Sequence, residues 1–178
     1  VLGKKAYKAI ADLPVVPDLA VLVVPTRLVL DMVEEFGRLG TKHMVIITAG
    51  FRETGTNGGA MEKVLVERAR HYGIRFLGPN CLGIVNTHLP LNITVGPVQD
   101  YKGKLGLASQ SGTYVAQVVS YLHKNGIALS KAISVGTRRT STSSTASSTW
   151  DRTITPAPSA STSRASGTRP ASWRWRPG

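Results

Sequence analysis

One short segment combines residue types that could hold an anion. Ser109-Gln110-Ser111-Gly112-Thr113 stands between a predicted strand and a predicted helix. The free N–H groups of a helix's first turn, its dipole and nearby hydroxyls together attract phosphate or carboxylate. No lysine follows the glycine at the spacing of a Walker loop. The segment therefore predicts either an anion site at Ser109, Gln110, Ser111 and Gly112 or simple capping of the helix by Ser109 or Ser111.

A second segment, Gly78-Pro79-Asn80-Cys81-Leu82-Gly83, joins rigid, permissive and amide-bearing residues. Asn80 can donate to and accept from a carbonyl or thioester. Cys81 is the single cysteine; it has no histidine near it in sequence and no helix start to depress its pKa. We therefore interpret Cys81 as a buried structural thiol rather than a nucleophile, and an internal disulfide is excluded.

Two further strand ends are candidates for a ligand groove. Val24 and Pro25 follow the first predicted strand, and Thr48, Ala49 and Gly50 follow the second. Ligands of open α/β sheets collect at the carboxyl ends of the strands, and glycine lets a ligand approach the backbone closely. These residues predict a binding groove, with plain turns as the alternative.

The four histidines, His43, His71, His88 and His123, have no metal-ligand spacing with cysteine, aspartate or glutamate. We expect structural or solvent-facing histidines and no metal site. No catalytic triad or pair of carboxylates can be asserted from the spacing either.

The elements that must position these residues alternate between strand and helix. Aliphatic runs predict strands over 19–24, 43–48 and 74–77. Helical spacing predicts one helix after Thr26, a possible N-cap, with Gly37 or Gly40 as its stop, and a second over 61–72. This order is typical of right-handed crossovers, so we predict an α/β fold with a doubly wound parallel sheet.

A second α/β unit is predicted further along the chain. Residues 103–108 form its first expected strand, 112–125 its helix and 132–135 its next strand. Between the two units, prolines, asparagines and glycines predict a largely irregular linker over 81–102.

The chain changes character at Thr137. Residues 137–178 hold 19 Ser or Thr and seven Arg but no Leu or Val, so they cannot bury enough apolar surface to offset the entropy of ordering. The plain interpretation is a disordered basic tail. A sharper hypothesis is a one-base deletion near codon 137, because plausible codons for 137–144, shifted by one base, encode the globular pattern N-E-A-D-V-D-F-V.

The formal net charge of +12 divides at the same point, into +6 up to Gly136 and +6 beyond it. The basic-aromatic cluster at 173–176 lies in the tail, so nucleic acid is not the favoured partner. No apolar run approaches the ~20 residues that cross a bilayer, and no secretion pattern opens the chain. We expect a cytoplasmic protein without a membrane partner.

Taken together, these segments resemble the NDP-forming acyl-CoA synthetases, which include the ADP-forming acetate-CoA ligases and relatives of the succinyl-CoA synthetase α subunit. The resemblance runs from about Gly3 to Gly136. Each piece alone is weak, but their order is specific. The matching residues are Asp18-Leu19-Ala20-Val21 with Val24-Pro25, Ile47-Thr48-Ala49-Gly50-Phe51-Arg52-Glu53, Gly78-Pro79-Asn80-Cys81-Leu82-Gly83-Ile84, Leu91-Asn92 and Ser109-Gln110-Ser111-Gly112.

The resemblance implies a Rossmann-like CoA-binding domain over 1–97, the start of a flavodoxin-like succinyl-CoA-synthetase domain over 98–136, and a tail over 137–178. Such enzymes interconvert acyl-CoA, phosphate and a nucleoside diphosphate with the acid, CoA and the triphosphate, through an acyl phosphate and a phosphohistidine. By position, the phosphoryl group would lie at Ser109, Gln110, Ser111 and Gly112. The CoA groove, with Asn80 near the thiol or acyl end, would be lined by Val24, Pro25, Thr48, Ala49, Gly50 and Asn80.

Two departures limit what the resemblance implies. The family's first strand and Gly-rich loop would precede Val1, and none of the histidines has the Ser-His-Thr-Gly-like neighbourhood of the phosphohistidine. The nucleotide-grasp domain, through which ADP or ATP with Mg²⁺ would bind, is also missing. We therefore expect a truncated chain with no catalytic residue and no activity alone.

Two other functions stay open. Related CoA-binding domains serve as regulatory modules of protein acetyltransferases, and a genuine tail would favour a basic nucleic-acid binder. Neither the acid substrate nor the choice of ADP or GDP is set by these residues.

Overall fold

The computed structural model describes residues 3–89, 91–94 and 102–136. The predicted tail over 137–178 and the hypothesised frame break lie outside these residues. The described part forms two β-sheets, each with its own apolar core. No helix within it is long and apolar enough to span a membrane.

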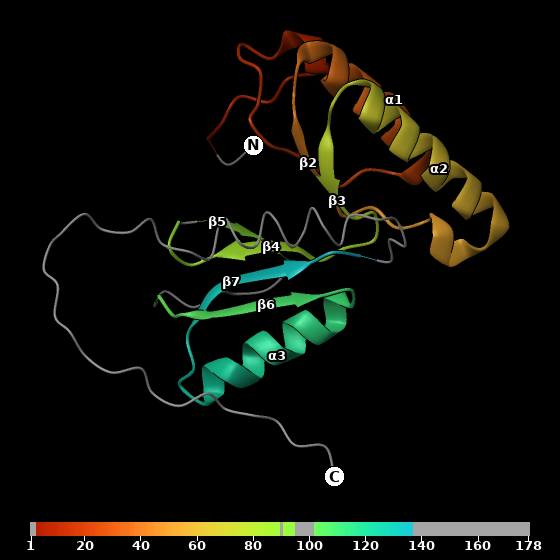
Figure 1. Ribbon diagram of the computed structural model, residues 1–178. Coiled ribbons are helices and arrows are strands. Elements are labelled where there is room, and N and C mark those ends of the chain that lie inside the picture. Colours follow the sequence, from red (N-terminus) through yellow and green to blue (C-terminus); the bar gives the residue numbers. More distant parts are fainter. Residues whose placement is uncertain (1–2, 90, 95–101, 137–178) are drawn as a thin grey trace, which may run out of the picture. The chain divides into compact units, whose positions relative to one another are not determined.

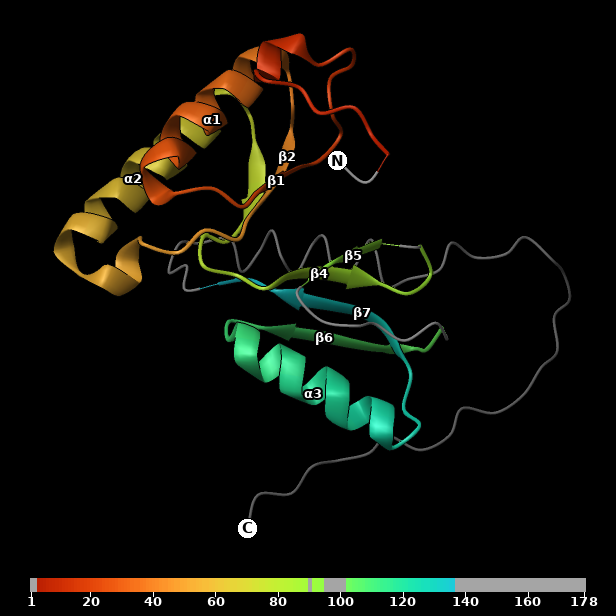
Figure 2. The same cartoon turned by 180° about the vertical axis from the view of Figure 1, so that it is seen from behind.

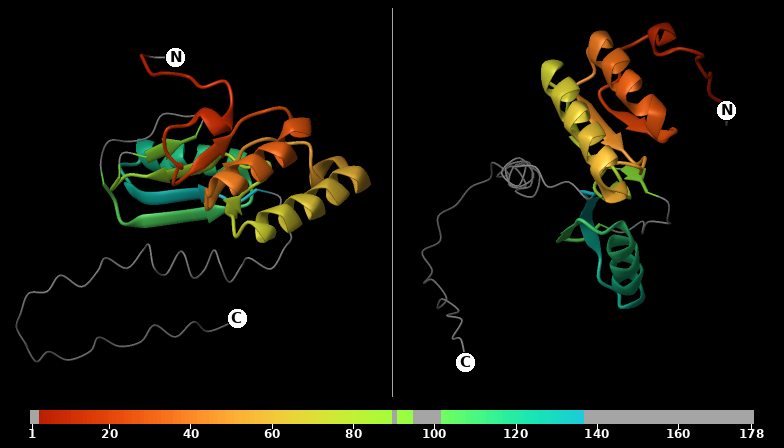
Figure 3. Two further views of the ribbon diagram at one scale, coloured as in Figure 1. Left: turned by 90° about the horizontal axis from the view of Figure 1, so that it is seen from above. Right: turned by 90° about the vertical axis from the view of Figure 1, so that its right-hand side faces the viewer.

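The first sheet is parallel, with strand order β1-β2-β3, as the alternating pattern predicts. Its helices α1 and α2 lie side by side (Figures 1 and 3). Aliphatic residues of both helices and of the strands fill the core between them, including Leu22, Val33, Ile46 and Leu65. The elements are η1 (Ile10–Asp12), β1 (Ala20–Leu22), α1 (Thr26–Leu39), β2 (His43–Ile46), η2 (Arg52–Thr54), α2 (Thr56–His71) and β3 (Arg75–Leu77).

The start of α1 differs from the prediction. Thr26 is the first helical residue, Pro25 holds the N-cap position, and no side chain caps the helix. Proline suits this place because it has no N–H to leave unsatisfied. The Thr26 hydroxyl donates instead to the carbonyl of Ala49. The helix ends at Gly40, which adopts a φ of 106°, so the predicted glycine stop is confirmed.

Helix α2 begins at Thr56 rather than at Met61, so it includes two glycines that the sequence pattern assigns to a loop. Gly58 is buried, and a Cβ at this position would lie only 1.8 Å from the carbonyl oxygen of Phe51. The glycine therefore permits a close approach between the helix and the preceding loop.

The second sheet has strand order β5-β4-β7-β6 (Figures 1 and 2). Strands β6 and β7 are parallel and α3 packs against both. Its elements are β4 (Gly83–Asn86), β5 (Leu91–Ile93), β6 (Leu105–Ser109), α3 (Gly112–Lys124) and β7 (Leu129–Ser134).

The predicted irregular linker over 81–102 is wrong where β4 and β5 lie. Strand β4 pairs antiparallel with both β5 and β7, so this sheet is mixed rather than purely parallel. Gly83 and Val85 are buried and alternate with half-buried residues, as in a strand covered on one face. The sheet division thus falls before Gly83, whereas the domain division after residue 97 stays a prediction.

Candidate functional site

The loops that follow β1, β2 and β3 are joined at Thr48. Its hydroxyl donates to the carbonyl of Val24 at 2.8 Å and accepts from the Val24 amide at 3.2 Å. Its carbonyl accepts from the Asn80 amide at 3.0 Å. Parallel strands bring their carboxyl ends to one edge, and Thr48 fixes the three loops there relative to one another.

A second contact ties the first two loops. The Thr26 hydroxyl donates to the Ala49 carbonyl at 2.8 Å. Gly50, the next residue, has a φ of 100°, and a Cβ at this position would lie 2.6 Å from the Thr26 oxygen. Both the backbone conformation and the available space require glycine here.

Glu53 closes the loop after β2 on itself. Its Oε1 accepts from the Gly50 amide at 2.6 Å and from the Phe51 amide at 3.2 Å. Phe51 is fully buried and anchors the loop in the core. The sequence analysis names Glu53 only as part of a motif. Its position three residues after Gly50 is the signal that could have indicated an acceptor for backbone amides.

The loop is also held from α2. Glu62 has a side chain only 1% exposed, and the Nε of Arg52 lies 3.3 Å from its Oε1. The same Nε donates a hydrogen bond to the other carboxylate oxygen, Oε2, at 3.4 Å, whereas Oε1 has no hydrogen-bond partner. Sequence reasoning missed this pair because a glutamate in a helix normally faces solvent.

Cys81 is a structural thiol, as predicted. It is 6% exposed, and its Sγ donates to the Ile46 carbonyl at 3.4 Å. Burial raises the pKa of the Cys81 thiol to about 11. A thiol that stays protonated at neutral pH is a poor nucleophile.

The segment around Ser111 shows the predicted capping. Ser109 ends β6, and its Oγ accepts from the Ser111 amide at 3.1 Å. Ser111 is the N-cap of α3, and its Oγ accepts from the Tyr114 amide at 3.2 Å. Both hydroxyls therefore organise the start of α3, and Gly112 is its first residue. An anion site at Ser109, Gln110, Ser111 and Gly112 stays a prediction.

Ser134, which the sequence analysis did not single out, joins this segment to the Asn80 loop. The Leu82 amide donates to the Oγ of Ser134, a fully buried residue at the end of β7, at 3.0 Å. A Cβ on Gly112 would lie 3.0 Å from the Cβ of Leu82. A Cβ on Gly136 would lie 2.2 Å from the Pro79 carbonyl oxygen. The two predicted site segments are thus packed together through Leu82 and Ser134.

Two histidines contact backbone carbonyls that are distant in the sequence, and a third contacts its neighbour. His43 Nδ1 lies 3.3 Å from the Asp18 carbonyl oxygen, and His88 Nε2 lies 3.0 Å from that of Gly103. His71 stacks edge-on against the neighbouring Tyr72. Among the described residues no group of three metal-ligating side chains occurs.

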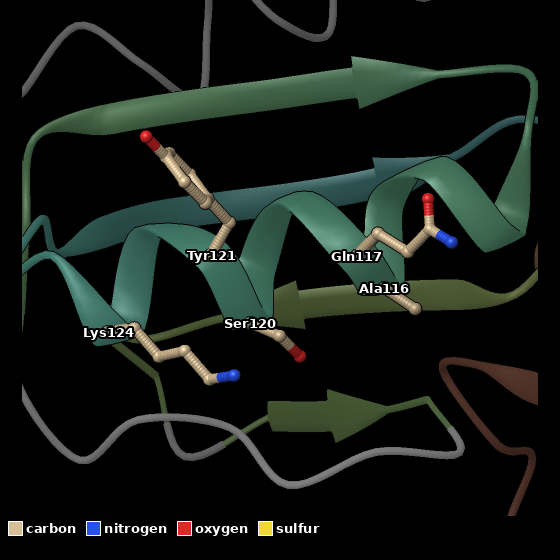
Figure 4. A pocket seen from close by; sticks show the side chains of 5 residues that line it. All are labelled: Ala116, Gln117, Ser120, Tyr121 and Lys124. Carbon is tan, nitrogen blue, oxygen red and sulfur yellow. The ribbon is translucent and has the colours of Figure 1, made fainter.

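A hollow of about 380 Å³ lies along the exposed face of α3 (Figure 4). Every residue that lines it belongs to this one helix, and none belongs to the predicted site. The lining residues are Ala116, Gln117, Ser120, Tyr121 and Lys124. The hollow is therefore a surface feature of α3 and does not extend the loops at the strand ends.

Comparison with known proteins shows which proteins this chain is similar to. A family model described as a CoA binding domain matches residues 1–87. The α subunit of ADP-forming acetate-CoA ligase II from Pyrococcus furiosus is 49% identical over 136 residues, which are 76% of this chain and 30% of that subunit. ADP-forming acetate-CoA ligase I from Archaeoglobus fulgidus is 41% identical over 138 residues, covering 78% of this chain and 20% of the ligase.

A solved structure of a related synthetase is also similar to this chain. The apo form of a dinucleotide-forming acetyl-coenzyme A synthetase from Ca. Korarchaeum cryptofilum superposes with a TM-score of 0.73 at 37% identity, over 77% of this chain and 30% of that one. The chain spans only about a fifth to a third of the length of these relatives. The chain thus matches a CoA-binding domain over residues 1–87, and over about three quarters of its length it is similar to ADP-forming acetate-CoA ligases.

Proposed function

We propose that this chain supplies the CoA-binding part of an NDP-forming acyl-CoA synthetase. The observation that carries the proposal is the joint at Thr48, which holds the loops after β1, β2 and β3 together. Such a preformed edge avoids the entropy of ordering three loops when the ligand binds.

The residues at this edge offer exposed apolar surface to a ligand. Pro25 and Ala49 are exposed and apolar, and Val24, Gly50 and Asn80 are half-buried beside them. The hydroxyl proton of Thr48 and the carbonyl of Ala49 are engaged internally. Their contribution to binding is therefore shape, and contacts to CoA fall to exposed apolar surface and to Asn80.

In the proposed reaction, acyl-CoA, phosphate and a nucleoside diphosphate are converted to the acid, CoA and the triphosphate. The bond that is cleaved is the thioester between the acyl group and CoA. The Asn80 amide group would orient the thioester carbonyl, and the start of α3 at Ser109 to Gly112 would hold the phosphoryl group through its dipole and N–H groups.

The partner in this proposal is the nucleotide-grasp domain or subunit of the synthetase. It would bind ADP or ATP with Mg²⁺, and the phosphate-carrying histidine would also lie outside the four histidines of this chain. We therefore expect no activity from the chain alone.

Calorimetric titration of the purified chain with acetyl-CoA tests the CoA proposal. We expect saturable binding of acetyl-CoA, and prior addition of CoA should reduce it by competition. The variant Gly50→Ala should bind more weakly because a Cβ would displace Thr26. Absence of acetyl-CoA and CoA binding to the folded chain would refute the proposed function.

A second assay tests the expected inactivity. The chain is incubated with acetyl-CoA, ADP, phosphate and Mg²⁺, and ATP is measured by a coupled luminescent reaction. ATP formation above the level without acetyl-CoA would show that the chain carries its own phosphoryl-transfer residue.

A further inference from the structure

We propose that Ser134 is a positioning residue that couples the acyl end of the CoA groove to the phosphate-binding start of α3. This inference rests on the proposed function and adds a residue to it. Ser134 is fully buried, so it acts on the ligands through the segments that it holds.

The first segment that Ser134 holds is the Asn80 loop. Its Oγ accepts the Leu82 amide at 3.0 Å, two residues beyond Asn80. Asn80 itself has a φ of 54°, a conformation that few residues other than glycine and asparagine adopt readily. The loop is thus held on both sides of Cys81, by Thr48 at the Asn80 amide and by Ser134 at the Leu82 amide.

The second segment is the start of α3. A Cβ on Gly112 would lie 3.6 Å from the Ser134 Oγ and 3.5 Å from the Leu82 amide nitrogen. Ser134 also pairs with Ser109 in the parallel ladder, and the next amide, Val135, donates to the Ser109 carbonyl at 2.9 Å. The Leu82 amide and the Ser134 Oγ therefore lie on the side of Gly112 where a side chain would stand, next to the first residue of α3.

The residues after β7 complete the arrangement. Gly136 has a φ of 76°, and a Cβ there would lie 2.2 Å from the Pro79 carbonyl oxygen and 3.1 Å from that of Asn80. The end of β7 thus contacts the Asn80 loop from one side and the Ser109 segment from the other.

Such a junction transmits binding energy between two sites. A loop fixed by acetyl-CoA would present a better ordered start of α3, so that phosphate binds with less loss of entropy. We assign the coupling to the Ser134 Oγ because it bonds the Leu82 amide just before the backbone ladder between Gly83 and Ser134 begins, and so extends the hold of β7 toward Asn80.

The test measures binding of inorganic phosphate to the chain, by amide shifts of Ser111 and Gly112 in NMR spectra, without and with saturating acetyl-CoA. In the natural chain we expect acetyl-CoA to tighten phosphate binding at least about fivefold. In Ser134→Ala we expect that factor to fall below about twofold while acetyl-CoA binding alone stays within about twofold of the natural chain.

Ser130→Ala is the matched control. Ser130 lies in the same strand, is also buried, and donates through its Oγ to the Leu105 carbonyl at 3.2 Å, at the end of β7 away from the site. It should lose comparable stability but keep the coupling. If Ser134→Ala does not fold, Ser134→Cys is the alternative, because its side chain still fills the site. Its sulfur is a weak acceptor for the Leu82 amide, so this variant should lose the coupling in the same way.

The outcomes separate the two proposals. No binding of acetyl-CoA refutes the proposed function, and no phosphate-dependent shift at Ser111 and Gly112 refutes the phosphate assignment; either result also ends the role of Ser134. If both ligands bind the natural chain but independently, or if Ser134→Ala keeps the coupling, the positioning role is overturned and CoA binding stands.

Discussion

The hydroxyl of Thr48 and the backbone of Val24 form a reciprocal pair, with donation to the carbonyl at 2.8 Å and acceptance from the amide at 3.2 Å. One side chain thereby satisfies both polar groups of a residue at the end of β1, where the ladder to β2 has stopped. Unpaired backbone groups at a partly buried edge are destabilising, so the pair fixes the loop conformation as well as its position.

Thr48→Val should destabilise the chain by about 1–3 kcal/mol, because the isosteric methyl leaves the Val24 amide and carbonyl without their partner. It should also weaken acetyl-CoA binding, since the loops after β1 and β2 lose their joint. Urea denaturation and calorimetric titration measure the two effects.

Thr41→Val is the matched control for that variant. Thr41 is fully buried, whereas Thr48 is half-buried, and the Thr41 hydroxyl has no hydrogen-bond partner in the structure. Replacing an unsatisfied buried hydroxyl by a methyl should leave the stability unchanged or raise it. Equal losses in the two variants would contradict the role of the Thr48 hydroxyl.

Gly50→Ala should lower the free energy of unfolding by about 1–3 kcal/mol, because alanine is strained at a φ of 100° and its Cβ would lie 2.6 Å from the Thr26 oxygen. The contact between Thr26 and Ala49 should break, which amide exchange near Ala49 would report. Gly59→Ala provides the comparison.

Gly59 has open space around its Cβ position and lies inside α2. Alanine there should stabilise the chain by up to about 1 kcal/mol, since it favours a helix over glycine. A destabilised Gly59→Ala variant would show that α2 does not begin as early as Thr56 in solution.

Arg52→Met should be destabilising, by about 2 kcal/mol or more, because it leaves the 1%-exposed carboxylate of Glu62 without its cation. The double variant Arg52→Met with Glu62→Met should recover much of that loss, since no buried charge remains. Thermal unfolding of the two single variants and the double variant completes the cycle, and additive losses would argue against the pair.

The stability of the chain should depend on Cys81 at alkaline pH. The pKa of its thiol is raised from 9.0 to about 11 by burial. Below pH 9 both the folded and the unfolded state hold the proton, so this contribution is fully present; between pH 9 and 11 the unfolded state releases it first, and stability falls.

Comparison with Cys81→Ala isolates this effect from the pH dependence of all other groups in the chain. The difference in free energy of unfolding between the natural chain and the variant should shrink from pH 9 to pH 11. A constant difference would mean that the thiol is not desolvated in the folded state.

Local sequence was sufficient where periodicity and a strong stop signal coincided. The aliphatic run before Val24 predicts β1, and the helical spacing before Gly40 predicts α1 with its glycine stop; both are confirmed. It was insufficient where a side chain had two possible partners. Thr26 is an ordinary N-cap candidate, but its hydroxyl bonds to Ala49, which lies 23 residues away in the sequence.

Non-local pairing explains the other differences. The glycines and prolines around β4 predict an irregular segment, and only the antiparallel partners supplied by β5 and β7 make Gly83–Asn86 a strand. Likewise, Gly58 lies inside α2 although glycine normally indicates a loop. Glycine is needed there because the Phe51 carbonyl takes the space that a Cβ would occupy.

The sequence by itself determined the α/β alternation and the similarity to ADP-forming acetate-CoA ligases, because both depend on residue type and order along the chain, whereas the ligand-binding loops stay a prediction. Tertiary structure decided what Ser134, Glu53 and Glu62 do. Ser134 in a strand and Glu62 in a helix carry no distinctive local pattern, and Glu53 shows only its spacing from a turn glycine. Their roles arise from partners that folding brings within hydrogen-bond or ion-pair distance.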